Sequence, residues 1–148
     1  MGGGGMFNVD SEKVRRIEVT IVCLQHGKPD PTAKMEYKII PLRMVTNNYQ
    51  IIELCRMIGT GEVPQSAGQA AAWHLTDGLS WQELAQKDRF YSQLTGARQK
   101  YFSGRELQFA YRIVAEAANR GKRLQKFESL RKQASPGDKQ NELLKTSD

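Results

Sequence analysis

The hydrophobic pattern of this chain changes its period near residue 47. Before that point, apolar and polar residues alternate over 15–24 and again over 33–42, a pattern typical of half-buried β-strands. The stretch between them, 26–32, is rich in glycine and proline and favours a turn. We therefore expect an N-terminal β-hairpin or a small antiparallel sheet.

After residue 47 the apolar residues follow the spacing of α-helices. The expected helices are 47–59, 64–78, 80–87 and a long C-terminal helix from about 104 to 133. The apolar stripe of the long helix is expected to comprise Leu107, Ala110, Tyr111, Val114, Ala117 and Ala118. Residues 88–102 fit neither pattern, although Gly96 favours a turn there. Strands that precede several helices predict an α+β fold.

The chain is expected to form one domain over 15–133. Its 148 residues are enough for a single hydrophobic core. Four consecutive glycines predict a flexible leader over 1–14, and polar composition predicts a disordered tail over 134–148. No apolar run approaches the roughly 18 residues that cross a bilayer, so no membrane span is expected. The first residues lack the apolar core of a secretory signal.

The chain has two cysteines and two histidines, which limits the metal and disulfide chemistry that is open to it. Cys23, Cys55, His26 and His74 lack the close spacings of zinc sites, so we expect no metal and no other cofactor. The sequence has no P-loop, GxGxxG, GxSxG or HExxH motif, which argues against a metabolic enzyme. A disulfide between the two cysteines stays open as an alternative and would require an oxidising compartment.

The motif Ser-x-x-Glu/Gln occurs three times just before an apolar run. It predicts capping boxes, in which the serine accepts from a backbone N–H and the acid or amide reaches back. The three pairs are Ser66 with Gln69, Ser80 with Glu83, and Ser103 with Glu106. A helix cap is thus one interpretation of Gln69. In the same structural interpretation, Cys23 is a small buried residue of a strand.

Cys23 and the stretch around Gln69 also permit a chemical interpretation. Cys23 lies at the end of a predicted strand, and residues 68–73, much later in the chain, read GQAAAW. This combination resembles the thioester domains of bacterial surface proteins, where a cysteine and the glutamine of a Thr-Gln-x-Ala-x-Trp motif condense into an internal thioester. Gly68 stands at the position of the threonine. The chain also resembles uncharacterised bacterial proteins that share CLxxGKxxP and QAAAWHL.

The resemblance implies that Cys23 and Gln69 form the bond. It implies a single covalent capture, so the protein would not be an enzyme in the sense of turnover. The partner would be a protein or a surface polymer that offers an amine or a hydroxyl group. The implied location is extracellular or at the cell surface.

Aromatic and histidine side chains are the candidates for supporting this chemistry. Trp73, Trp81 and Tyr37 are available to exclude water. His74 or His26 would move the proton, and the sequence does not choose between them. Free N–H groups at the start of the helix would stabilise the oxyanion.

Two other classes of function stay open. The segment 119–133 has six basic side chains and one acidic one, which predicts a non-covalent interaction module for an acidic partner or a wall polymer. Its candidate binding residues are Arg120, Lys122, Arg123 and Lys126. Nucleic-acid binding is less favoured, because no known nucleic-acid-binding signature accompanies the charge. The net charge of +6 permits anionic partners without requiring them, and the oligomeric state is not predicted.

Overall fold

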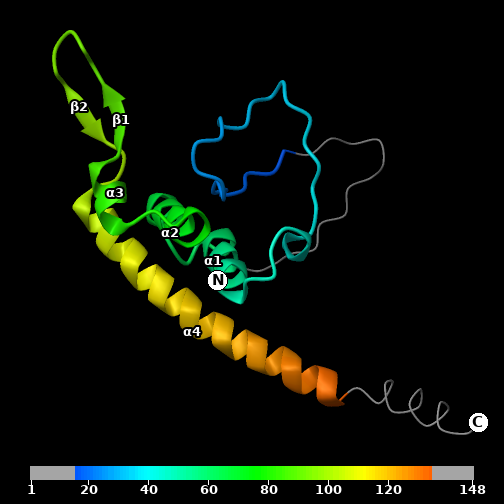
Figure 1. Ribbon diagram of the computed structural model, residues 1–148. Coiled ribbons are helices and arrows are strands. Elements are labelled where there is room, and N and C mark those ends of the chain that lie inside the picture. Colours follow the sequence, from blue (N-terminus) through cyan, green and yellow to red (C-terminus); the bar gives the residue numbers. More distant parts are fainter. Residues whose placement is uncertain (1–15, 135–148) are drawn as a thin grey trace, which may run out of the picture.

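The computed structural model describes residues 16–134 of the chain (Figure 1). The predicted leader and the predicted tail, apart from residue 134, lie outside the described residues. Three helices form the body: α1 (Tyr49–Gly59), α2 (Gln65–Asp77) and α4 (Gly104–Ala134). In the described part of the chain, no helix combines the length and the apolar character needed to cross a membrane.

The hydrophobic core lies where α1 and α2 pack against the first half of α4. The residues that these helices contribute to the core are Leu54, Met57, Ile58, Ala67, Ala70, Ala71, Ala72, Trp73, Ala110, Ile113 and Ala117. Small residues on α2 and α4 let the helices approach closely. A Cβ added at Gly68 would lie 2.8 Å from Ile58 Cγ1, and one at Gly121 would lie 2.9 Å from the Gln50 backbone nitrogen.

Two of the three predicted capping boxes are confirmed. The short helix α3 (Trp81–Gln86) begins after Ser80, whose side chain and Glu83 form the complete box. At the start of α4, the Ser103 N–H donates to the Glu106 carboxylate at 2.7 Å, and the Glu106 N–H donates to Ser103 Oγ at 3.2 Å. These boxes satisfy backbone groups that a helix start otherwise leaves unpaired.

The antiparallel hairpin of this α+β fold lies between α3 and α4. Its strands are β1 (Asp88–Tyr91) and β2 (Arg98–Lys100), with Phe90 opposite Gln99. Gly96, at φ 67°, provides the left-handed residue of the turn. Figure 1 shows the hairpin projecting beside the start of α4. The predicted fold class is confirmed, but the hairpin is not the one predicted at the N-terminus.

The predicted N-terminal strands, 15–24 and 33–42, are not strands in their described residues. The apolar residues of the alternating pattern are exposed, for example Ile17 at 54% and Ile39 at 99%. Alternation produces a strand only where a second backbone edge pairs with it and another layer covers it. In the described part of the chain no strand pairs with these segments, and Val22 and Leu24 are the residues of 16–24 that pack against the core. A short 3-10 helix, Leu42–Met44, connects them to α1.

α4 covers the core with its first half and then continues past α1 (Figure 1). Its buried residues are Ala110, Ile113, Ala117 and Gly121. The stripe is therefore rotated from the predicted one, because Ile113 is buried and Tyr111 is 63% exposed. The last turns carry Phe127 and Leu130 as exposed apolar residues.

Candidate functional site

Gln69 lies on α2 and contacts the main chain of Cys23. The Cys23 N–H donates to Gln69 Oε1 at 2.8 Å, and Gln69 Nε2 donates to the Cys23 carbonyl oxygen at 2.8 Å. Both hydrogen bonds are partly buried and join residues 46 positions apart. The structure thus brings together the two residues that the sequence singled out.

This contact replaces the predicted capping box between Ser66 and Gln69. Helix α2 begins directly after Pro64, which provides no side-chain cap. Gln69 therefore lies in the second turn, beyond the unpaired N–H groups of the helix start. The Ser66 side chain is instead the largest cause of the lowered pKa of the Glu106 carboxyl group.

A second glutamine holds the same segment one helical turn earlier. Gln65 Nε2 donates to the Ile21 carbonyl oxygen at 2.7 Å. Gln65 and Gln69 are four residues apart and share a face of α2. Ile21 and Cys23 are two residues apart, so their main-chain polar groups point to the same side of an extended chain. Side chains of α2 therefore bind this edge of residues 21–23 as a neighbouring strand would.

The Cys23 thiol is half-buried and free, and it donates to the Gln25 carbonyl oxygen at 2.9 Å. Cys55 is also free, so the alternative disulfide is not formed. Burial raises the pKa of the Cys55 thiol. A raised pKa reduces the thiolate fraction at neutral pH, which makes Cys55 a poor candidate for the nucleophile.

A pocket of about 570 Å³ opens beside the contact between Cys23 and Gln69. Its walls come from residues 21–31, the first turns of α2 and the hairpin region, and include Arg89 and Tyr101. The Arg89 guanidinium lies 4.9 Å from the centroid of the Tyr101 ring. A volume of this size accepts a side chain or a small molecule, so an outside group has access to the pair.

The two hydrogen bonds hold the Gln69 carboxamide in a geometry that suits acyl transfer. The Cys23 N–H already donates to the oxygen that becomes negative when a nucleophile adds to the carboxamide carbon. In such a reaction the N–H of Cys23 itself would be the oxyanion donor. The sequence had suggested the N–H groups at the start of the helix, but the position of Gln69 in the second turn removes it from them.

Trp73 is the predicted supporting aromatic that lies next to this site. It is 6% exposed and lies one helical turn beyond Gln69. Its ring centroid is 4.9 Å from that of His26, 5.2 Å from that of Tyr101 and 5.8 Å from that of Phe102. Of this aromatic cluster, Tyr101 and Phe102 line the pocket, and Trp73 packs behind them.

The other predicted supporting residues lie elsewhere. His74 stacks on Trp81 with 4.3 Å between ring centroids, and its Nδ1 lies 2.7 Å from the Leu79 carbonyl oxygen. Tyr37 is 61% exposed and exchanges hydrogen bonds with the main chain of Thr32. His74, Trp81 and Tyr37 do not line the pocket. Their contacts stabilise local structure.

Lys87 makes a long-range contact that the sequence did not single out. Its Nζ lies 2.7 Å from His26 Nε2, across 61 positions of sequence. A lone lysine after a short helix carries no sequence signal, so only the folded chain reveals this pair. In the described residues, no group of three or more potential ligands is placed to hold a metal ion.

The four basic residues predicted to bind a partner fall into two pairs. Arg120 contacts two carboxylates at 2.7 and 2.8 Å, and one of them, Glu116, also lies 3.8 Å from Arg123. Lys122 and Lys126 are exposed. Because both arginines have carboxylate partners, the charge that this face offers to a partner is smaller than the sequence suggested.

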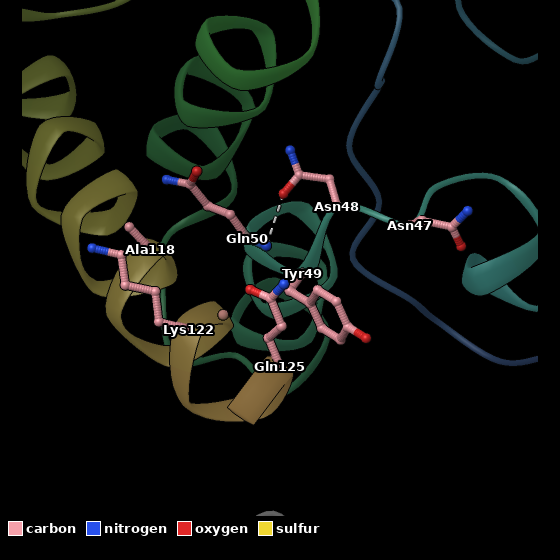
Figure 2. A pocket seen from close by; sticks show the side chains of 8 residues that line it. Asn47, Asn48, Tyr49, Gln50, Ala118, Lys122 and Gln125 are labelled. Carbon is pink, nitrogen blue, oxygen red and sulfur yellow. Dashed lines mark hydrogen bonds between the residues drawn. The ribbon is translucent and has the colours of Figure 1, made fainter. Parts of the chain in front are cut away.

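A second hollow, of about 340 Å³, lies between the start of α1 and α4 (Figure 2). Amide side chains and Lys122 line it. Asn48 Oδ1 accepts from the Gln50 N–H at 2.9 Å, and Gln50 Nε2 donates to the Val114 carbonyl oxygen at 3.0 Å. Capping and packing of α1 account for these groups, so we place the candidate site at Cys23 and Gln69.

No protein-family model, curated protein or solved structure matches the chain.

Proposed function

We propose that this domain forms an internal thioester between Cys23 and Gln69 and uses it to attach covalently to a partner. The observation that supports the proposal is the pair of 2.8 Å hydrogen bonds between the Gln69 carboxamide and the Cys23 main chain. They hold the carboxamide beside the residue whose thiol would attack it, next to an open pocket.

The reaction balances without a co-reactant. The Cys23 sulfur adds to the carboxamide carbon, the C–N bond breaks, and the thiol proton leaves with the nitrogen as ammonia. For this step the thiol must release its hydrogen bond to the Gln25 carbonyl oxygen and turn towards the carboxamide carbon. An amine or hydroxyl of the partner then attacks the acyl carbon, the C–S bond breaks, and the thiol regains a proton. The product is an amide or ester between the Gln69 side chain and the partner.

The proposed setting is extracellular or at the cell surface. The reduced thiols of the cytosol would exchange with a thioester and consume it. The partner is a protein or a surface polymer that presents the nucleophile. Because each chain reacts once, the protein is a capture device and not a catalyst with turnover.

The intact mass of freshly purified protein tests this proposal. We expect a mass lower than the calculated one by one ammonia, followed by addition of one methylamine on treatment. Both changes should disappear in Cys23→Ala and in Gln69→Ala. A wild-type mass equal to the calculated one, with two thiols open to alkylation, would contradict the proposal.

Gln65→Ala provides the matched control for that experiment. It removes a glutamine from the same face of α2 and from the same extended segment, but it leaves both reacting groups in place. We expect this variant to retain the loss of ammonia. If Gln65→Ala abolished the loss of ammonia as completely as Gln69→Ala, the result would show that both glutamines act by positioning residues 21–23, and not that Gln69 reacts.

A non-covalent interaction module is the second candidate function, and the last turns of α4 favour it. Phe127 and Leu130 are 63% and 54% exposed there, beside the exposed Lys126. Such a surface suits an acidic partner with apolar side chains. Salt-sensitive binding to immobilised polyglutamate, weakened by Lys126→Glu and unchanged by Cys23→Ala, would support this function separately from the thioester.

A further inference from the structure

We infer that His26 and Lys87 form the acid–base pair of the Cys23–Gln69 site. This inference rests on the proposed thioester and adds the groups that move its protons. The two side chains are in direct contact, with Lys87 Nζ 2.7 Å from His26 Nε2. With the lysine as donor, Nε2 accepts and the ring proton lies on Nδ1.

His26 lies in the turn that follows Cys23 and contacts the helix that carries Gln69. It follows Cys23 by three residues, in the turn whose Gln25 carbonyl oxygen accepts from the thiol. Its ring meets the ring of Trp73 edge-on, at 4.9 Å and 82°. Trp73 lies one turn after Gln69 on α2. The imidazole therefore bridges the turn that holds the thiol and the helix that holds the carboxamide.

The environment of Lys87 is unusual for a lysine. Its Nζ lies 5.3 Å from the centroid of the Trp73 ring and 5.5 Å from that of Tyr101. The neighbouring carboxylate, Asp88, is bound by other cations, with Lys100 at 3.1 Å. Among the described contacts, Lys87 has aromatic faces and an imidazole as partners and no carboxylate. A lysine held in this way can pass a proton to the histidine.

The other histidine has no such arrangement. His74 is bound at Nδ1 by the Leu79 carbonyl oxygen and covered on one face by Trp81. The structure therefore chooses between the two histidines that the sequence left open. It favours His26 as the group that moves the proton.

The pair begins and ends each step in the same protonation state. During thioester formation it accepts the proton of the Cys23 thiol and delivers one to the Gln69 nitrogen as the C–N bond breaks. During capture it accepts a proton from the attacking amine or hydroxyl and delivers one to the sulfur as the C–S bond breaks. Ammonia, and then the regenerated thiol, carry the protons away.

The rate of methylamine addition to the thioester form, followed by intact mass, tests this inference. Loss of a general acid–base group typically slows a reaction about 10²-fold or more, and we expect this for His26→Ala. Lys87→Met is expected to slow capture in the same direction, by about 10-fold or more, because it removes the partner that supplies the proton. His74→Ala is the matched control and should react at the wild-type rate.

Chemical rescue separates proton transfer from a structural role. Imidazole in solution should restore part of the rate in His26→Ala and change the rate of His74→Ala no more than that of the wild type. Thermal melting shows whether each variant is folded. A folded His26→Ala that reacts at the wild-type rate, or that is slow without rescue, would overturn the inference and leave the thioester intact. A wild-type chain without ammonia loss would instead overturn the proposed function.

Discussion

Gly121 is the residue on which the packing of α1 against α4 depends most closely. A Cβ at this position would lie 2.9 Å from the Gln50 nitrogen and 3.0 Å from the Tyr49 carbonyl carbon. Both are backbone atoms, so relief would require movement of α1 itself. Gly68 differs, because its nearest neighbours are side-chain atoms of Ile58. A threonine there, as in the resembling family, would require only that side chain to move.

Gly121→Ala is expected to lower the free energy of unfolding by about 1–3 kcal/mol, the usual cost of an overpacked core. This loss should exceed the gain from the higher helix propensity of alanine. Gly104→Ala is the matched control, since nothing lies within 4 Å of an added Cβ. Chemical denaturation measures both variants, and equal stabilities would show that α1 shifts without cost.

Cys55 offers a second test at the scale of single residues. Burial raises the pKa of its thiol, so less thiolate is present at neutral pH. We expect alkylation of Cys55 in the folded protein to be slow at neutral pH and to accelerate as the pH rises. In denaturant the same thiol should react faster at the same pH. Peptide mapping after timed alkylation measures both rates, and a folded-state rate equal to the denatured one would contradict the burial.

At the scale of elements, Ser66 and Glu106 connect the start of α2 to the start of α4. Hydrogen bonding from Ser66 is the largest cause of the lowered pKa of Glu106, and the Ser103 backbone comes next. A carboxyl whose pKa is lowered by folding contributes stability above its unfolded pKa. That contribution is lost as the pH falls through the folded pKa. Acid therefore weakens this connection as the Glu106 carboxylate becomes protonated.

Ser66→Ala is expected to raise the pKa of Glu106 towards its ordinary value. The folded protein should then lose less stability between neutral and acidic pH than the wild type loses. An NMR titration of the Glu106 side chain measures the shift directly. Ser129→Ala, further along the same helix, is the control and should leave that titration unchanged.

Sequence patterns predicted the helices well because helix ends are local events. Gly78 and Ser80 lie at the helix ends where the sequence placed them, and α1 begins at Tyr49, two residues after the predicted start. The hairpin was missed because 88–102 shows no alternation, and a two-stranded ribbon with both faces exposed needs none. The alternation over 15–24 misled for the converse reason, since strand formation depends on a partner that no local pattern reveals.

The candidate site shows the same limit. Cys23 and Gln69 were paired through a resemblance, and their contact is present. The form of that contact, side chain to main chain, was not predictable. The residues Ser66-x-x-Gln69 match the capping-box motif, so the sequence alone could not show that Gln69 binds Cys23 instead. Lys87 was missed because its contact with His26 depends on the path of the whole chain.

At the scale of the whole molecule, side-chain hydrogen bonds attach the described segment before α1, residues 16–48, to the helical body. Gln65 and Gln69 hold it at one end, near residues 21–23. At the other end Glu128, on the far part of α4, accepts from Arg43 and from the Tyr49 hydroxyl. These bonds lower the pKa of Glu128, with the Tyr49 bond as the largest cause.

Removal of this second attachment should loosen the segment without unfolding the core. We expect Glu128→Ala to increase hydrogen exchange over 42–48, while exchange in the buried part of α2 stays at the wild-type level. Glu116→Ala is the control, because that carboxylate pairs with arginines of its own helix. Unchanged exchange over 42–48 would mean that other contacts hold the segment.

Among the described residues, the Gln69 carboxamide hydrogen-bonds to main-chain atoms of Cys23, so positions 69 and 23 tolerate change differently. Any residue at position 23 except proline offers the same N–H and carbonyl, so the fold should accept serine or alanine there with little loss. Position 69 has no such freedom, because few side chains carry a donor and an acceptor in that arrangement. Selection for architecture alone would therefore preserve the glutamine and let the cysteine drift. A mutational scan scored once for folding and once for covalent capture would separate the requirements of the fold from those of the reaction. Position 23 should be essential for capture only, and position 69 for both.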